Sequence, residues 1–154
     1  MNVLLASPWP LDFRGGVTVV VRMLGRGLAR SGDQVAYLVP THGRGIQRSE
    51  DAGLPVFYVP MRLASVPAHP LRGRISFLLH FPLTCFRLAE ILRRQKIDVV
   101  NAHYFTAHWI YFLFLRLFLR FRLVISVHGT DVQGSEGQKN IQRMERWQRR
   151  IDKL

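Results

Sequence analysis

The chain has 154 residues, 48% hydrophobic and 21% charged, which is enough apolar material for one globular domain and excludes a disordered polar chain. Lysine and arginine outnumber acidic residues by 22 to 10, and the resulting net charge of +12 favours anionic partners: a phosphorylated small molecule, nucleic acid or an anionic membrane surface. The single cysteine, Cys85, excludes an internal disulfide and a thiolate metal cluster, and is typical of a reducing cytoplasm.

The first predicted elements are a strand and a helix joined by a glycine-bearing loop. Residues 2–7 are a short apolar run closed by Pro-Trp-Pro, which predicts a strand because proline cannot donate to a strand ladder. A helix follows Gly15 and Gly16, and Ser31-Gly32 ends it with a typical C-terminal stop. Its apolar side chains share one face: Val17, Val20, Val21, Leu24 and Leu28.

Two further strands and a second helical region follow. Residues 34–40 and 55–60 are short, rich in β-branched side chains and closed by proline, so both are predicted strands, with an exposed polar loop at 41–54. Residues 74–95 are predicted to be helical. Pro82 should break or kink this helix near Phe81, because proline removes a backbone donor and clashes one turn back.

Residues 97–103 and 122–129 are predicted strands on either side of an apolar helix at 106–120. Strands therefore alternate with helices, and a parallel connection needs a crossover of about a dozen residues or more. We expect one α/β domain over residues 1–154, a Rossmann-like three-layer sandwich with a mostly parallel sheet. In such sheets ligands bind at the carboxyl ends of the strands.

Two segments near the end of the chain have apolar residues in a number or spacing that is typical of helices. The apolar residues within 137–154 lie at helical spacing, which predicts an amphipathic helix that runs to the last residue. Residues 109–127 are long enough to span a bilayer, but Arg116, Arg120 and Arg122 would each cost about 2.5 to 3.5 kcal/mol near its centre. We therefore do not expect this segment to be a transmembrane helix.

The pair Gly15 and Gly16 lies between the first strand and the first helix. Without a Cβ, such a pair lets a ligand approach backbone amides, and the helix N-terminus favours negative charge by about 0.3 to 1 kcal/mol. A phosphate or a sugar would fit there. The alternative is an ordinary tight turn, because neither of the common phosphate-loop patterns is present.

Histidines cluster in sequence after the last two predicted strands. His103 ends one strand with His108 soon after it, and His128 and Asp131 follow the other. A neutral imidazole there can bond a sugar hydroxyl or a phosphate, and a protonated one can offset charge on a leaving group. Asp131 can hold a hydroxyl or orient His128. The alternative for His103 and His108 is a partly buried ring satisfied by a backbone carbonyl.

Metal and nucleic-acid sites find little support in the sequence. No metal is expected, because no His-Glu-x-x-His pattern or Cys/His spacing occurs. No nucleic-acid-binding signature occurs either. Arginines mixed with Phe and Leu at 71–79, 86–96 and 114–122 could rest on anionic lipid. The alternative is an ordinary solvated face whose arginine stems cover apolar surface.

Three segments in this order resemble the N-terminal domain of family 4 glycosyltransferases, which are retaining enzymes of the GT-B fold. They are RGGVTVVVRMLGRGLARSGDQVAYLVP at 14–40, IDVVNAHYF at 97–105 and LVISVHGTDV at 123–132. The resemblance implies transfer of a hexose-type sugar, with retention, from a nucleotide-sugar donor to a glycan, lipid or small-molecule acceptor. The donor is a substrate, so the resemblance implies no cofactor and no metal.

The resemblance also implies roles for particular residues. The loop at Gly15 and Gly16 would approach the donor phosphates, and His128 would lie beside the transferred sugar as the catalytic residue. His103 and Asp131 would be acceptor-side neighbours. Retention is usually attributed in this family to front-face attack assisted by the leaving phosphate, so no dedicated protein base is expected.

In this family a second domain holds most of the nucleotide, and residues 1–154 do not match it. We therefore expect a truncated acceptor-side domain, inactive alone, that needs a donor domain in cis or in trans. We expect it in the cytoplasm, with peripheral contact at the inner membrane face. Two alternatives stay open: a non-catalytic module with a basic membrane- or partner-docking surface, and a flavodoxin-like domain that binds a nucleotide cofactor.

Overall fold

The structure is a computed structural model that describes residues 1–43, 45–63, 70–104 and 106–128. Strands and helices alternate along most of the chain. In chain order the elements are β1 (Asn2–Ala6), α1 (Gly16–Arg30), β2 (Gln34–Thr41), β3 (Gln47–Asp51), β4 (Leu54–Pro60), α2 (Pro70–Arg94), β5 (Val99–His103), the short 3-10 helix η1 (Ala107–Trp109), α3 (Ile110–Leu115) and β6 (Arg122–Ser126).

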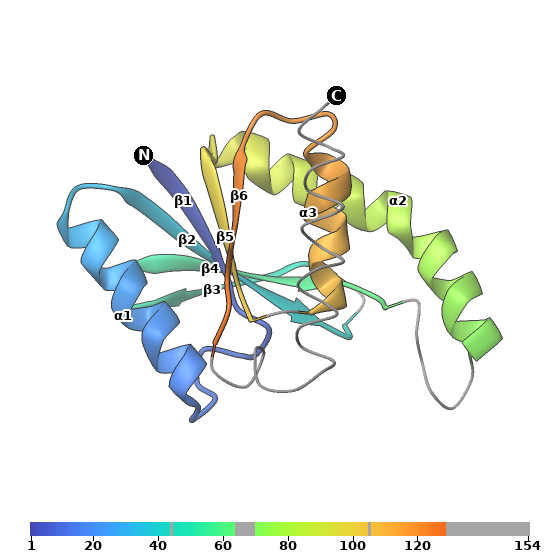
Figure 1. The fold of residues 1–154 in the computed structure, drawn as a ribbon, viewed down its shortest axis with the longest axis horizontal. Coiled ribbons are helices and arrows are strands. Elements are labelled where there is room, and N and C mark those ends of the chain that lie inside the picture. The colour runs from blue at the N-terminus through green and yellow to red at the C-terminus, as the bar shows by residue number, and fades with distance from the viewer. Residues whose placement is uncertain (44, 64–69, 105, 129–154) are drawn as a thin grey trace.

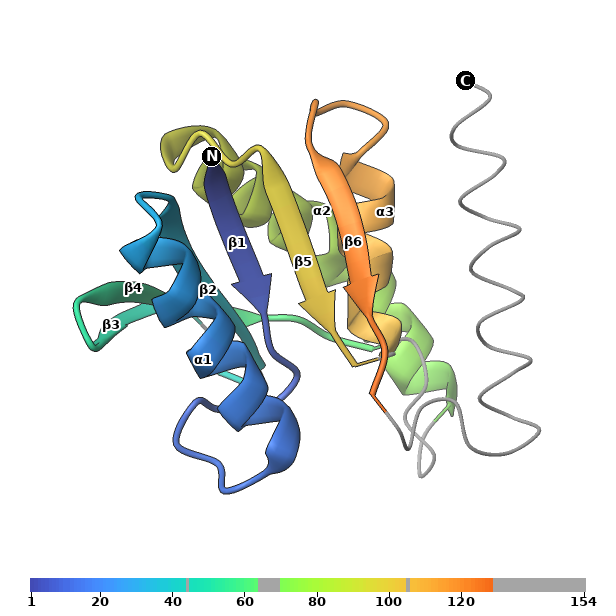
Figure 2. The ribbon, with the colours of Figure 1, turned by 60° about the vertical axis from the view of Figure 1, so that its left-hand side comes forward.

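The described strands form one twisted sheet in the order β3-β4-β2-β1-β5-β6, with β1 between β2 and β5 (Figure 2). Neighbours are parallel except β3 and β4, which are antiparallel. In the centre Leu4 lies opposite Ala36 on one side and Val100 on the other. Parallel pairing brings the carboxyl ends of β1, β2, β5 and β6 to one edge, so the predicted mostly parallel sheet is confirmed.

Helix α1 covers one face of the sheet, and α2 with α3 covers the other (Figures 1 and 2). Leu4 and Leu5 of β1 are both fully buried although successive strand residues face opposite ways, so this strand needs apolar cover on both sides. Leu5 packs with Val21 of α1, and Leu4 packs with Leu88 of α2 and Phe112 of α3. The predicted three-layer Rossmann-like sandwich is therefore confirmed.

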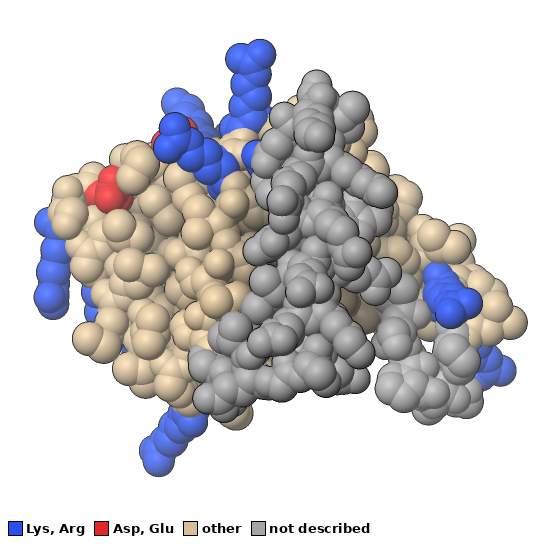
Figure 3. All heavy atoms as spheres, viewed as in Figure 1, with Lys and Arg blue, Asp and Glu red and all other residues tan. Residues whose placement is uncertain are grey.

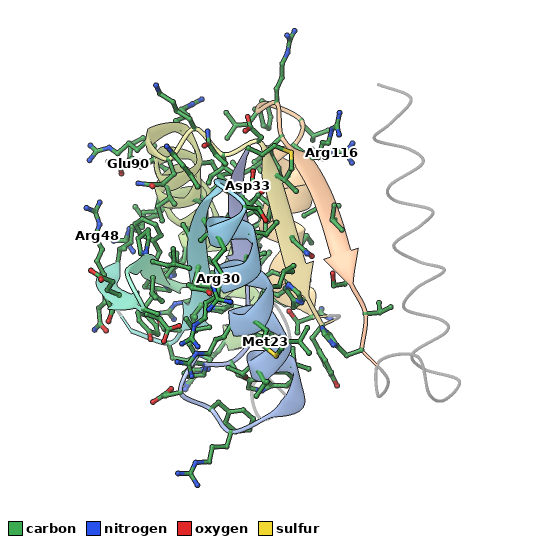
Figure 4. All side chains as sticks on the ribbon, turned by 90° about the vertical axis from the view of Figure 1, so that its left-hand side faces the viewer. Met23, Arg30, Asp33, Arg48, Glu90 and Arg116 are labelled. Atoms are coloured by element: carbon green, nitrogen blue, oxygen red, sulfur yellow. The ribbon has the colours of Figure 1, made fainter. Side chains whose placement is uncertain are left out.

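Helix α1 ends where the sequence predicts. The amide of Ser31 donates to the carbonyl of Gly27, and Gly32 adopts a φ of +88°, a left-handed conformation that glycine takes without steric cost. The terminal ammonium group of Met1 pairs with Asp33 at 2.7 Å, just after the helix (Figure 4). This ion pair ties the start of β1 to the turn that leads into β2.

The prediction of an exposed loop over residues 41–54 is wrong in part, because the loop contains β3. Residues Asp51 to Leu54 close a hairpin with β4, and Ala52 and Gly53 both have positive φ, as a two-residue hairpin turn requires. The sequence pattern did not indicate β3, because this edge strand is exposed and polar and shows no apolar alternation. Arg22 of α1 holds it through a 2.7 Å ion pair with Asp51.

Helix α2 starts earlier than predicted and is not broken at Phe81, because it runs through Pro82 to Arg94. The axis of its ribbon bends along its length (Figure 1). Pro82 lies on the exposed side of the helix, where the carbonyl one turn back can bond to water instead of to the missing amide. A kink on this exposed side therefore costs less free energy than the loss of a backbone hydrogen bond on the packed side would.

The predicted helix at 106–120 is shorter in the structure. Helix α3 ends at Leu115, and tight turns follow in which the amides of Leu117 and Phe118 donate three residues back. Residues 109–127 thus comprise α3, a turn and β6, and do not form one spanning helix. The strand predicted at 122–129 ends at Ser126. The helix predicted at 137–154 lies outside the described residues.

The surface reflects the basic composition. In the face drawn in Figure 3, lysine and arginine side chains project around the margin, and acidic atoms show in only a few places. The amino-terminal half of α2 carries Arg72 and Arg74, both exposed.

A close approach of α1 to β2 gives the first prediction. A Cβ on Gly25 would collide with the Tyr37 ring, 2.7 Å from Cζ, whereas one on Gly27 would meet no atom within 4 Å. Gly25→Ala should therefore destabilise the fold by about 1 to 3 kcal/mol through overpacking. Gly27→Ala should stabilise it by about 0.5 to 1 kcal/mol through helix propensity.

Urea unfolding followed by circular dichroism measures both changes. If the two substitutions had the same sign, or Gly25→Ala were neutral, the close packing of α1 on Tyr37 would be contradicted.

Candidate functional site

Side chains from separate loops meet at the carboxyl edge of the parallel strands. The loop after β1 runs from Ser7 to Gly15, and residues Tyr104 to Thr106 follow β5. The amide of Ser7 donates to the carbonyl of Leu38 at 2.9 Å, which extends the β1–β2 pairing by one residue. The rings of Trp9 and Tyr104 lie 4.8 Å apart edge to face, so the two loops are in direct contact.

The glycine pair forms the start of α1. Gly15 is the N-cap residue with an extended backbone, and no side chain caps the helix. A Cβ on Gly15 would lie 2.8 Å from the Phe13 ring, whereas one on Gly16 would meet nothing within 4 Å. The first turn of α1 therefore presents uncapped backbone amides beside open space, an arrangement that favours an anion.

Thr18, on the first turn of α1, is not among the site residues that the sequence predicts. It is 1% exposed, and its hydroxyl has no hydrogen-bond partner among the described residues. A buried unpartnered polar atom costs about 1 to 3 kcal/mol, so native proteins keep few of them. The available signal was a hydroxyl among apolar residues, two positions after the glycine pair.

His103 and His128, which the sequence places at the same edge of the sheet, are in contact with each other. Their Nδ1 and Nε2 atoms lie 3.3 Å apart, and their ring centroids 5.5 Å apart. His103 is only 1% exposed, and its Nε2 has no partner among the described residues. The alternative of a fully satisfied buried ring therefore does not hold for His103, because one ring nitrogen lacks a partner there.

Burial, with a smaller effect of the neighbouring His128 ring, lowers the pKa of His103 from 6.5 to about 4. The His103 ring is therefore neutral at neutral pH, with one N–H donor and one acceptor nitrogen. One nitrogen engages His128, and the tautomer decides which ring donates. The other is left to bond a hydroxyl or a phosphate oxygen.

The backbone around the pair is held tightly. Tyr104 has a φ of +63°, which is unusual for a residue other than glycine, and its amide donates to the carbonyl of Ser126 at 2.9 Å. Its own carbonyl accepts a 2.6 Å hydrogen bond from the buried indole of Trp109. The hydroxyl of Ser126 donates to Asn101 at 2.8 Å, which joins β5 to β6 below the pair.

His108 lies apart from this pair. Its Nδ1 is 3.3 Å from the hydroxyl of Thr106, and burial, with a smaller effect of His42, lowers its pKa to about 4. The ring is half-buried, as the alternative expects, but its partner is a side-chain hydroxyl and not a backbone carbonyl. Within the described ranges no three His, Cys, Asp or Glu side chains group closely enough to hold a metal.

The structure brings only part of the predicted site together. His103 and His128 are in contact, and Gly15 and Gly16 lie at the same sheet edge, linked through Trp9 and Tyr104. Asp131 lies outside the described residues, so its place near the acceptor stays a prediction.

The neutral state of His103 predicts how stability depends on pH. The unfolded imidazole takes up a proton below 6.5 and the folded one only near 4, so in between the unfolded state binds more protons and acid favours unfolding. Replacing His103 by Gln should remove a slope of about 1.4 kcal/mol per pH unit from the stability curve in this window.

Urea unfolding across the same pH window, with His80→Gln as the matched control, measures this slope. Equal slopes for wild type and His103→Gln would contradict a neutral His103.

Solved structures share the fold. Sixteen chains match, among them sucrose-phosphate synthase from Thermosynechococcus elongatus, with a TM-score of 0.62 and 14% identity over 97% of this chain and 39% of that one. A shorter chain of that enzyme matches with a TM-score of 0.52 and 15% identity, over 90% of this chain and 70% of that one. The present chain thus spans 39% of the longer enzyme chain, and likeness at such identity shows the fold alone.

Sequence comparison gives the family. No curated protein sequence matches significantly. A family model described as Glycosyltransferase Family 4 matches residues 14–154, which include the glycine loop and both histidines of the pair. The chain therefore belongs to Glycosyltransferase Family 4, with the fold of the N-terminal half of a GT-B enzyme.

Proposed function

We propose that this chain is the acceptor-side domain of a glycosyltransferase that moves a hexose-type sugar from a nucleotide-sugar donor to a glycan, lipid or small-molecule acceptor with retention. The observation that carries the proposal is the histidine pair at the carboxyl edge, where the buried Nε2 of His103 has no hydrogen-bond partner among the described residues. A donor-binding domain, in cis or in trans, supplies the remaining contacts to the nucleotide.

The donor phosphates bind at the start of α1. The amides after Gly15 have no capping side chain, and the space next to Gly16 is open. The helix dipole adds partial positive charge at the same point. A diphosphate there is stabilised as it leaves, because the amides are already oriented before the sugar–oxygen bond breaks.

His128 lies beside the transferred sugar as the catalytic residue. It is half-buried, two residues beyond β6, and in contact with His103. An imidazole in that place donates to or accepts from a sugar hydroxyl and orients the ring. The leaving phosphate accepts the proton of the incoming hydroxyl on the same face, so no protein carboxylate serves as base.

The acceptor approaches on the side of His103 and Asp131. The free nitrogen of His103 bonds an acceptor hydroxyl, and the neutral ring avoids placing a buried charge there. Trp9 stacks on Phe13 with ring centroids 5.9 Å apart, and Phe13 is half exposed. Such rings offer a flat apolar surface to the face of a sugar.

The nucleotide sugar is a substrate, and the reaction uses no cofactor and no metal. A cytoplasmic location suits a protein whose single cysteine, Cys85, is a buried thiol. The second candidate, a non-catalytic binding module, is favoured by exposed apolar side chains on α2 and α3, among them Leu79 and Phe114. Binding of nucleotide sugars at the glycine loop separates the two candidates.

The test is a titration of the full chain with a panel of nucleotide sugars, observed by saturation-transfer NMR. Gly16→Val should weaken binding of the preferred donor at least about tenfold, because the side chain fills the phosphate space and shields the helix amides. Gly27→Val, on the same helix and also without neighbours within 4 Å, should bind like the wild type.

Turnover by the chain alone should be negligible. Equal binding by the two glycine variants would remove the phosphate-site assignment. Absence of binding to every nucleotide sugar by the chain rejoined to a donor-binding domain would favour the binding module.

A further inference from the structure

The outer face of α2 is apolar although it faces solvent. One turn of helix takes 3.6 residues, so positions 71, 75, 78, 79 and 86 fall on one side. Leu79 and Phe86 are 73% and 67% exposed. The exposed apolar residues of this helix are Leu71, Ile75, Leu78, Leu79, Leu83 and Phe86. Single exposed apolar side chains are ordinary, but a stripe along most of a helix requires an explanation.

A second set of exposed apolar side chains lies next to α2, on α3 and the turn after it. Phe81 of α2 contacts Phe114 of α3 with ring centroids 5.1 Å apart, and Phe114 contacts Phe118 at 5.2 Å. Ile110, Phe114, Leu117 and Phe118 are all exposed. We call this surface, formed by the exposed apolar residues of α2 and of residues 110–118, the α2–α3 apolar face.

Basic side chains border this face. Arg72 and Arg74 are exposed on α2 beside the stripe, and Arg120 is exposed beyond α3. Glu90 is the single acidic residue of α2, and it is paired with Arg94 at 2.8 Å. The apolar stripe can therefore insert into an apolar phase, and the arginines that border it attract negative charge.

We propose that the α2–α3 apolar face docks the domain on an anionic lipid bilayer, with α2 lying in the plane of the membrane surface. Leucine and phenylalanine side chains enter the boundary between head groups and acyl chains, and the bordering arginines contact lipid phosphates.

The orientation of α2 follows from its inner face. Among the described residues, Leu71–Arg94 is the one segment long and apolar enough to cross a membrane by length and composition. Its inner side chains Thr84, Leu88 and Leu92, however, are buried against the rest of the domain. Crossing the bilayer would expose this core, so the helix lies on the membrane instead of through it.

Charge argues for lipid over the other occupants. Two copies packed face to face would bring their arginine borders together, which like-charge repulsion disfavours. Residues 129–154 carry six basic and four acidic side chains, so their charge does not complement the border either. Anionic lipid neutralises the border on every side. The proposal does not depend on sugar transfer, because lipid binding needs no donor or acceptor.

The test is co-sedimentation of the full chain with vesicles of phosphatidylcholine mixed with phosphatidylglycerol, compared with phosphatidylcholine alone. The wild type should pellet with the anionic vesicles and far less with the neutral ones, and high salt should release much of it. Leu79→Glu should lower partitioning at least about tenfold, because a charge enters the apolar phase. Arg74→Gln should lower it about fivefold.

Two matched controls lie on α1, on the opposite side of the sheet. Met23 is 69% exposed, so Met23→Glu adds the same charge at an equally exposed apolar position. Arg30→Gln removes the same charge as Arg74→Gln (Figure 4). Both controls should partition within about twofold of the wild type.

Equal binding by Leu79→Glu and Met23→Glu, or equal binding to neutral and anionic vesicles, would overturn the proposal. Light scattering tests one alternative. If the Leu79→Glu variant had a lower mass in solution than the wild type, the face would be assigned to a second copy of the chain. A melting temperature that falls on Leu79→Glu, with vesicle binding unchanged, would assign the face to the chain's own residues 129–154.

Discussion

The parallel pairing of β1 with β2 and β5 is the constraint on which the rest of this structure depends. A strand buried on both faces must satisfy every backbone group within the sheet and needs helices above and below. Once β1 is so placed, the register sets Ala6 opposite both Leu38 and Ala102. The neighbouring strand pair, β5 with β6, sets His103 opposite Ser126. The glycine loop and both histidines therefore lie at one edge of the sheet.

At that edge the chain keeps polar groups without partners, which a stable core ordinarily avoids. The buried nitrogen of His103 and the hydroxyl of Thr18 have no partner among the described residues, and the left-handed Tyr104 adds backbone strain. The compensation comes from elsewhere: Trp109 is fully buried and donates to the Tyr104 carbonyl, and Asn101 joins β5 to β6. The rigid sheet thus holds an arrangement that is ready for a polar ligand.

Much of the fold could be predicted from the sequence because its signals are local. Apolar runs closed by proline marked the central strands, and Ser31-Gly32 marked the end of α1. The edge strand β3 could not be predicted, because its residues are polar and no apolar alternation marks their pairing with β4. For the site, strand ends predicted the edge, but the contact of His103 with His128 and the burial of Thr18 depend on packing that spacing does not encode.

The proposed site for the donor diphosphate and its sugar is the carboxyl edge between the start of α1 and the histidine pair. The most direct measurement is the side-chain nitrogen NMR spectrum of the histidines during addition of the preferred nucleotide sugar. We expect the ring resonances of His103 and His128 to move together as the ligand saturates, while those of His80 on α2 stay in place. Saturable binding that leaves both His103 and His128 unmoved would contradict the proposed site.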